Sequence, residues 1–194
     1  MTSEDREIWN KRYLQGAYAD RNSPSEILKK WLHLCPPGRA LDIACGIGRN
    51  ARYLSESGYE TIGLDISNVA IESARDLDGT ANRKVEYLVH DFDNGIPVLG
   101  KFDLVIMVRF LDWRVVSSIE QHLHVSGRAL FEQHLKYNSD EPLAGPRSNR
   151  FRVDSGELQT HISHMEIVRE FEGLVTDSDG RKSAVVQVLA QKSP

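Results

Sequence analysis

The chain has 194 residues, of which 40% are hydrophobic, and this length and composition suit one globular domain with its own core. Its formal net charge is -4 and its pI is about 6.0, which argues against the strongly basic surface of a general nucleic-acid binder. No apolar run approaches the length of a membrane span, and the charged first residues lack a signal-peptide core, so we expect a cytoplasmic protein without nucleic-acid or membrane partners.

Two short helices are expected before the first strand. The first, over residues 4–14, begins with acidic residues and places Trp9 and Tyr13 at helical spacing. The second, over residues 26–34, carries an apolar stripe and ends before a Pro-Pro-Gly sequence. We expect both helices to pack across one end of the sheet and to cover the turn that follows the first strand. Tyr13 is interpreted either as core packing or as a ligand contact.

The strongest local pattern is a strand, a glycine turn and a helix at residues 39–54. Residues 40–45 form a short, mostly apolar run that is typical of a buried parallel strand, and a helix is expected from Gly48 onward. Gly46 and Gly48 leave the intervening turn without bulky side chains, so a ligand can lie against the backbone amides there. The pattern predicts a nucleotide-type site at the first strand-to-helix turn of an α/β fold.

The charge of Asp42, near the end of that first strand, bears on which ligand binds the turn. The turn also fits the loose dinucleotide pattern G-x-G-x-x-G/A, which is a weak signal by itself. A carboxylate there would repel a pyrophosphate but attract the ammonium and sulfonium groups of S-adenosylmethionine (SAM), by on the order of a few kcal/mol at about 4 Å. The alternative is that Asp42 only caps backbone amides. We favour SAM as the cofactor.

Strand and helix patterns alternate along the rest of the chain and end in a hairpin. Asp-Ser-Asp-Gly at residues 177–180 is a hairpin turn signal between the last two strands. The expected strands cover residues 59–65, 85–90, 102–108, 128–135, 164–172 and 183–191; helices are expected over residues 68–77 and 115–123, and a short one opens at residues 154–157.

Two more acids follow the second and third expected strands. Asp65 ends the second strand, at the distance from the glycine turn where a carboxylate takes both ribose hydroxyls; the alternative is a helix N-cap residue. Ile66 next to it is suited to the adenine face. Asp91 is placed to accept a hydrogen bond from an exocyclic amine and Phe92 to stack on a purine; the alternative for Asp91 is an Asx turn.

The carboxyl ends of the fourth and fifth strands supply the candidates for the chemistry. Arg109 follows the most hydrophobic strand, where open α/β sheets bind ligands, and Asp112 and Trp113 after it are candidates to shape an acceptor pocket. His134 is our candidate base if the acceptor must lose a proton; the alternative is a hydrogen-bonded structural histidine. The long polar loop over residues 136–152 is typical of a lid or substrate loop, and its arginines are candidates to receive an anionic substrate.

Neither the histidines nor the cysteines indicate a metal site. His122 and His124 lack a third ligand nearby in the sequence. Cys35 and Cys45, the two cysteines of the chain, belong to no Cys-x-x-Cys or zinc spacing, so we expect reduced thiols.

The order of elements resembles the class I SAM-dependent methyltransferase fold, over nearly the whole chain. Residues 41–50, Leu-Asp-Ile-Ala-Cys-Gly-Ile-Gly-Arg-Asn, carry the resemblance most specifically, with Gly-Leu-Asp-Ile-Ser at residues 63–67. Trp-Asn-x-Arg-Tyr at residues 9–13 and Arg-Asn at 49–50 look most like the small tellurite-resistance-type methyltransferases. The resemblance implies one methyltransferase domain over residues 1–194, with a helical cap (1–37) and a SAM-binding core (38–194). It implies a doubly wound, Rossmann-like, seven-stranded sheet with helices on both faces and a terminal antiparallel hairpin.

The resemblance also implies roles for single residues. Asp42 would lie near the methionine amino group of SAM, the turn from Ala44 through Gly46 to Gly48 would wrap the methionine and ribose, and Asp65 would bind the ribose diol. Ala44 stands where the usual motif has its first glycine. The remaining expected cofactor contacts are Tyr13, Arg49, Ile66, Asp91, Phe92 and Arg109, of which Arg109 would lie beside the methyl group.

The function expected from these observations is methyl transfer from SAM to a small-molecule acceptor by direct in-line displacement. Such a step needs positioning and exclusion of water more than acid–base chemistry. One alternative is an NAD-dependent oxidoreductase that uses the same turn; Asp42, the terminal hairpin and the lack of a Tyr-x-x-x-Lys pair argue against it. Another is a non-catalytic SAM-binding protein. The acceptor atom stays open among thiols, oxyanions and hydroxyls, and we expect a monomer or a homodimer.

Overall fold

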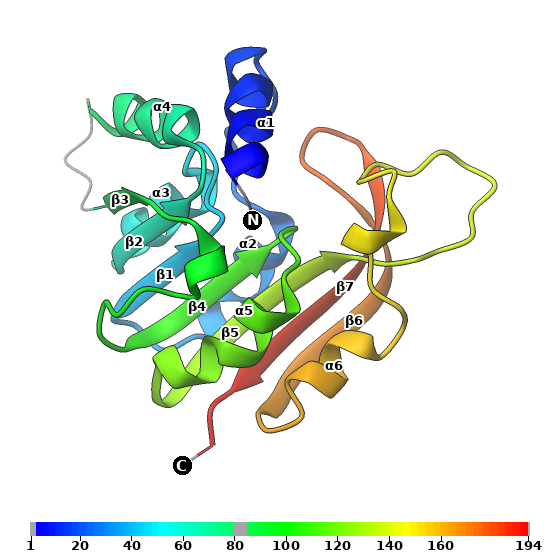
Figure 1. Cartoon of the computed structure of the whole chain (residues 1–194). Coiled ribbons are helices and arrows are strands. Elements are labelled where there is room, and N and C mark those ends of the chain that lie inside the picture. Colours follow the sequence, from blue (N-terminus) through cyan, green and yellow to red (C-terminus); the bar gives the residue numbers. More distant parts are fainter. Residues whose placement is uncertain (1–2, 80–84, 194) are drawn as a thin grey trace.

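A single seven-stranded sheet runs through the protein, in the order β3-β2-β1-β4-β5-β7-β6 (Figure 1). This computed structural model describes residues 3–79 and 85–193, so residues 1–2 of the expected cap and residues 80–84 and 194 of the expected core lie outside the described residues. The strands are β1 (Arg39–Ile43), β2 (Glu60–Asp65), β3 (Val85–Val89), β4 (Phe102–Val108), β5 (Leu123–His134), β6 (Glu166–Thr176) and β7 (Lys182–Gln191).

β7 alone runs antiparallel to the other strands, because it is inserted between β5 and β6 as the second arm of the terminal hairpin. β1 lies between β2 and β4 and pairs with both in parallel. Since β1 and β4 are covered on both faces, they read in the sequence as apolar runs rather than as alternating patterns. The expected fold class, a seven-stranded sheet with helices and a terminal antiparallel hairpin, is confirmed.

Helices cover both faces of the sheet. The helices are α1 (Ser3–Leu14), α2 (Glu26–Trp31), α3 (Arg49–Glu56), α4 (Asn68–Asp78), α5 (Trp113–Ser118) and α6 (Glu157–His161), with 3-10 turns η1 (Leu32–Leu34), η2 (Phe92–Asn94), η3 (Ile119–His122) and η4 (Asn149–Phe151). α2 and α3 bury their apolar residues against one face of β1, β4 and β5, whereas α5 and α6 cover the other face. No helix in the described ranges is both long and apolar enough to cross a membrane.

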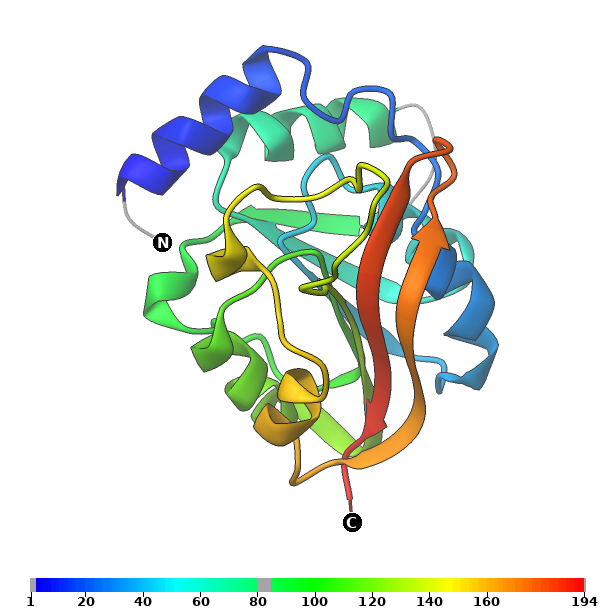
Figure 2. The ribbon, with the colours of Figure 1, turned by 90° about the vertical axis from the view of Figure 1, so that its right-hand side faces the viewer.

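The two N-terminal helices differ in how they pack. α1 lies against α4 above the carboxyl ends of the strands (Figure 2), where Asn10 donates to Asn68 at 2.8 Å and accepts from Ser67 at 2.7 Å. α2 does not lie across the end of the sheet as expected. Its stripe of Ile27, Leu28 and Trp31 is buried on the sheet face, because these three side chains point to one side of the helix.

Several expected boundaries are wrong at the end of the sheet. The expected helix over residues 115–123 ends as α5 at Ser118 and continues only as η3. β5 begins at Leu123 rather than at residue 128, because Leu123 pairs with Phe102 across an irregularity in the β4–β5 ladder. β6 extends to Thr176 rather than residue 172, because its pairing with β7 continues to the hairpin turn.

Candidate cofactor and acceptor site

The turn between β1 and α3 has a backbone that only small residues accept readily. Ala44, Gly46 and Gly48 all have left-handed φ values, of 56°, 56° and 79°. A Cβ atom on Gly46 would lie 2.7 Å from the hydroxyl oxygen of Tyr13, and one on Gly48 would overlap the ring of Tyr87. The two glycines are therefore required by the protein's own tyrosines. Ala44 carries strain of about 1 kcal/mol, which explains why glycine suits this position.

Asp65 ties this turn to the start of α4. One of its carboxylate oxygens accepts a hydrogen bond from the backbone amide of Gly46 at 2.8 Å, and the other accepts one from the backbone amide of Ser67 at 2.9 Å. Burial raises the pKa of Asp65 to about 6, although the two amides lower it. Ser67, which accepts the amide of Ala70 at 3.1 Å, is the N-cap of α4, so the N-cap alternative for Asp65 is wrong. Two amides leave further lone pairs of the carboxylate for hydroxyl donors.

Asp42 is a buried acid near the end of β1, within reach of the charge of Arg49 and of a hydrogen bond from the backbone of Ala51. Its side chain is on the same edge of the sheet as Asp65 and is 1% exposed. Among the described residues, its Oδ2 has no hydrogen-bond partner. Burial raises the pKa of Asp42 to about 8, an effect that Arg49 opposes and Asp65 reinforces. A buried carboxylate oxygen without a donor suits a cationic ligand group such as an ammonium, so this side of the turn fits SAM.

Tyr13 and Arg49 border the turn on the side of the N-terminal segment. The hydroxyl of Tyr13 lies over Gly46, and burial, followed by the charge of Asp65, raises the pKa of this tyrosine. Arg49 donates to the hydroxyl of Ser25 at 3.1 Å and to the carbonyl of Ser23 at 3.3 Å. Burial lowers the pKa of Arg49, and this cation begins α3, where the helix dipole disfavours it. The surroundings of Arg49 therefore favour an added anionic group.

Asp91, Phe92 and Ile66, the residues expected to contact the adenine, are instead capping a turn or buried in the core. Asp91 caps η2 by accepting the amide of Asp93 at 3.0 Å, which is the Asx-turn alternative. Phe92 is 1% exposed and its ring contacts the rings of His90 and Phe110, at centroid distances of 5.3 and 5.2 Å. Because the ring belongs to the core, it is not free to stack on a purine in this arrangement. Ile66 is also buried.

Arg109 is held in a network of ion pairs rather than presented to an open pocket. It has a left-handed φ of 59°, and its backbone amide donates to the carbonyl of Glu132 at 2.6 Å. Its Nε donates to Glu132 at 2.8 Å, and its two terminal nitrogens donate to the two carboxylate oxygens of Asp177 at 2.7 and 2.6 Å. Burial lowers the pKa of Arg109, but the two carboxylates raise it further than burial lowers it. The other oxygen of Glu132 accepts Gln187 at 2.7 Å.

His134 ends β5 close to this network and is 8% exposed. Burial, followed by the charges of Arg109 and Arg152, lowers its pKa to about 3, so the imidazole is neutral near pH 7. Its Nδ1 has no hydrogen-bond partner in the described part of the chain. The alternative that His134 is a structural histidine held by a hydrogen bond is therefore not supported at this atom. A pKa this low makes His134 a weak base, because proton transfer to it from an acceptor is uphill.

Asp112 and Trp113 both have partners within the protein. Asp112 is the N-cap of α5 and accepts the amide of Arg114 at 2.9 Å. Trp113 stacks on His161 of α6, with ring centroids 4.0 Å apart and an interplanar angle of 11°. Asp112 therefore caps α5 and Trp113 packs it against α6, and a role of either residue in lining an acceptor pocket stays a prediction.

The long loop after β5 folds back on its own backbone. Arg152 donates to the carbonyls of Pro146 at 3.1 Å and Leu135 at 3.0 Å, and Arg150 lies over the ring of Phe151. These contacts use both arginines to hold the loop. A recess of about 470 Å³ lies along it, lined by Lys136, Tyr137, Asn138, Ser139, Glu141, Leu143, Asn149 and Arg152.

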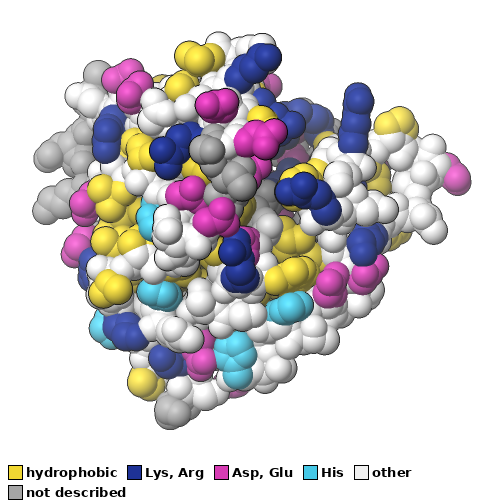
Figure 3. Space-filling view, in the orientation of Figure 1, with side chains coloured by type: hydrophobic (Ala, Val, Ile, Leu, Met, Phe, Trp, Pro, Cys, Tyr) yellow, Lys and Arg dark blue, Asp and Glu magenta, His cyan; other side chains and the backbone are white. Residues whose placement is uncertain are grey.

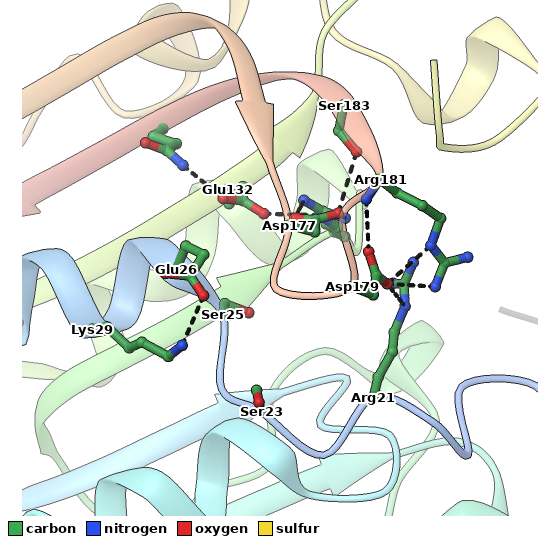
Figure 4. Close-up of polar contacts among 12 residues, drawn as sticks. Arg21, Ser23, Ser25, Glu26, Lys29, Glu132, Asp177, Asp179, Arg181 and Ser183 are labelled. Atoms are coloured by element: carbon green, nitrogen blue, oxygen red, sulfur yellow. Dashed lines mark hydrogen bonds and ion pairs between the residues drawn. The ribbon is translucent and has the colours of Figure 1, made fainter. Parts of the chain in front are cut away.

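Sequence reasoning missed four charged residues beside this site. Glu132 and Asp177 bind Arg109, while Arg21 and Asp179 form an ion pair between the N-terminal segment and the hairpin turn (Figure 4). The turn signal at residues 177–180 placed two of these acids in a hairpin, but nothing in the spacing indicates their arginine partners. On the face in Figure 3, basic and acidic side chains are mixed rather than separated by sign. No group of metal-ligating side chains occurs within the described ranges.

The sequence is similar to known methyltransferases. Residues 40–131 match a family described as "Methyltransferase domain". An uncharacterized methyltransferase of Schizosaccharomyces pombe is 41% identical over 82 residues, covering 42% of this chain and 57% of the relative. The probable S-adenosyl-L-methionine-dependent methyltransferase TehB of Haemophilus influenzae is 26% identical over 169 residues, covering 80% of this chain and 58% of TehB. The chain thus spans little more than half the length of these curated relatives.

Solved structures with low sequence identity share the fold. The crystal structure of TehB from Haemophilus influenzae superimposes with a TM-score of 0.72 at 22% identity, over 87% of this chain and 62% of TehB. A structure described as "Conversion of a Disulfide Bond into a Thioacetal Group during Echinomycin Biosynthesis" has a TM-score of 0.77 at 17% identity, over 97% of this chain and 91% of the other. At these identities the likeness concerns the fold alone.

Proposed function

Since this chain belongs to the class I SAM-dependent methyltransferases, we propose that it transfers the methyl group of SAM to a small-molecule acceptor by direct in-line displacement. The observation that carries the proposal is the buried Oδ2 of Asp42, which has no partner among the described residues and lies at the strand edge beside the glycine turn. When bound, SAM supplies an electrophilic methyl group on a positively charged sulfur. A carboxylate there favours that charge, whereas it would repel the pyrophosphate of a dinucleotide.

The cofactor would be held by groups from both ends of the turn. Asp42 would pair with the ammonium of the methionine part, and Arg49, which has neutral oxygen partners and opposes the dipole of α3, would pair with its carboxylate. Asp65 already fixes the turn through the Gly46 amide and would use its remaining lone pairs for the ribose hydroxyls. Tyr13 would cover the turn from α1.

The protein would accelerate the displacement mainly by positioning the reactants and excluding water. Arg109 holds the turn of the β6–β7 hairpin against the end of β5 through Asp177 and Glu132, so we assign it a positioning role rather than contact with the methyl group. His134, neutral near pH 7, would orient the acceptor as a hydrogen-bond acceptor at Nδ1 and would not remove its proton. A direct displacement needs no base from the protein when the acceptor enters the site already deprotonated, as an oxyanion or a thiolate that has lost its proton to solvent.

Isothermal titration calorimetry with SAM on the wild type and Asp65→Ala tests the cofactor assignment. We expect micromolar binding by the wild type, about -8 kcal/mol, and its loss in the variant. Binding of NADH without a response to SAM would refute the proposal and favour the oxidoreductase alternative. Transfer of a labelled methyl group to a panel of thiols, oxyanions and hydroxyl compounds then separates an active enzyme from a non-catalytic SAM-binding protein.

A further inference from the structure

The turn between β6 and β7 lies beside the segment that joins α1 to α2 (Figure 2). Within the turn, a carboxylate oxygen of Asp179 is 3.2 Å from Nε of Arg21, and the two side chains are 19% and 14% exposed. Arg181, in the same hairpin as Asp179, also donates to that carboxylate, at 2.9 Å (Figure 4). The Arg21–Asp179 ion pair therefore joins two distant parts of the chain, although Nε of Arg21 makes no hydrogen bond within the described residues.

Contacts between aromatic rings also connect Arg21 to the turn between β1 and α3, which is called the cofactor turn below. Its guanidinium carbon lies 5.1 Å from the ring centroid of Tyr18, and the Tyr18 ring is 6.0 Å from that of Tyr13. The hydroxyl of Tyr13 lies over Gly46. Tyr18 has a left-handed φ of 66°, a conformation that a bulky residue keeps only when its surroundings hold it. A continuous series of contacts thus runs from Asp179 to the cofactor turn.

Side-chain hydrogen bonds also attach α1 to the start of α4. They are the hydrogen bonds that join Asn10 to Ser67 and Asn68, and most residues of α1 are exposed or half-buried. Helices of this length are marginal without packing of an apolar face. The position of Tyr13 over the turn consequently depends on how the segment after α1 is held, and Arg21 is the point at which the hairpin turn holds it.

We propose that Arg21 and Asp179 are positioning residues that keep the α1–α2 segment, and with it Tyr13, closed over the cofactor turn. This inference rests on the proposed use of that turn for SAM. Breaking the ion pair would release the segment, so the loss of the pair should mainly increase the dissociation rate of SAM. Arg109 fixes the β6–β7 turn at the edge of the sheet through Asp177. The same turn would then also hold the α1–α2 segment over the cofactor site.

SAM binding and dissociation by the full chain test the role of the pair. Arg21→Gln and Asp179→Asn should each weaken SAM binding roughly 3- to 10-fold, the range expected for a partly buried ion pair, mainly through faster dissociation. The double variant should bind no more weakly than either single one, and Arg21→Lys should recover part of the loss. Arg181→Gln is the matched control, because it removes a partner of Asp179 inside the hairpin and should leave SAM affinity unchanged.

A second measurement separates failure of this inference from failure of the proposed function. Hydrogen exchange of the ligand-free protein should be faster in residues 15–24 of the Arg21→Gln variant than in the wild type or Arg181→Gln. Unchanged exchange, or a double variant whose losses in SAM affinity add, would overturn the inference. If the wild type binds no SAM, the proposed function fails, while the exchange experiment still decides whether the pair holds the segment.

Discussion

Arg109 and Asp177 form a two-point ion pair, with nitrogen–oxygen distances of 2.7 and 2.6 Å, although they are 68 residues apart in the sequence. The same guanidinium donates to Glu132, which is 2% exposed and also accepts Gln187. The network joins the ends of β4, β5 and the β6–β7 hairpin at the edge of the sheet where the cofactor turn lies.

Removing Arg109 should destabilise the fold. We expect Arg109→Gln to lower the free energy of unfolding by about 2–4 kcal/mol, because it leaves Glu132 buried without a cation. Urea unfolding followed by circular dichroism measures the change. Arg114→Gln is the control, since Arg114 pairs with Asp112 and Asp93 on the surface, and its unfolding curve should overlie that of the wild type. Equal curves for both variants would contradict the buried role of the Arg109 network.

Asp42 should make the ligand-free protein more stable at low pH than at high pH. Its pKa is raised to about 8 from 3.8, so the folded state binds the proton more tightly than the unfolded state. This contribution to stability is complete below about pH 4 and is lost as the pH rises toward 8. Asp42→Asn should raise the melting temperature of the ligand-free protein at pH 8, with little change near pH 4.

The same substitution tests whether Asp42 serves the ligand. An asparagine can accept a hydrogen bond from an ammonium but carries no negative charge to pair with it, so Asp42→Asn should weaken SAM binding by at least about 10-fold. A gain in stability combined with a loss of affinity marks a residue kept for binding. A variant that is less stable at pH 8, or that binds SAM as the wild type does, would contradict this assignment.

Ala44 should tolerate replacement by glycine better than a neighbouring helical alanine. Because Ala44 has a φ of 56°, Ala44→Gly relieves strain and should stabilise the protein by about 0.5–1 kcal/mol. Ala51 lies inside α3 and is fully buried, so Ala51→Gly should destabilise by about 1 kcal/mol or more. Thermal unfolding of both variants decides the matter, and shifts of the same sign would refute the strain at Ala44.

Protonation of His134 should lower the free energy of unfolding in acid. Its pKa falls from 6.5 to about 3 on folding, so its neutral form contributes stability above pH 6.5 that is lost as the pH falls toward 3. The loss approaches about 1.4 kcal/mol per pH unit for one such group. His134→Gln should remove this part of the acid dependence in urea titrations between pH 7 and 5. An unchanged slope would show that the imidazole titrates normally.

Local patterns were enough to predict the order of elements and the glycine turn between β1 and α3. The apolar run of β1 and the left-handed backbone at the two glycines after it are local signals, since a buried strand and a tight turn restrict which side chains fit. The tyrosines that pack over those glycines come from distant parts of the chain. Errors arose where tertiary pairing overrode local preference. Leu123 reads as the end of a helix but pairs with Phe102 as the start of β5. The sequence context of Phe92 suggested a ring that stacks on a ligand, but the side chain is buried in the hydrophobic core.

The sequence by itself determined the fold class and the acids at the strand ends, because strand and helix periodicity and turn chemistry act over a few residues. Only the tertiary structure decided the partners of Arg109 and Arg21 and the burial of His134. Charge pairing depends on which strand ends and loops meet in space, and no spacing along the chain encodes the meeting of β5, the β6–β7 turn and the segment after α1. Burial, which fixes the pKa of Asp42 and of His134, likewise exists only once those elements pack together.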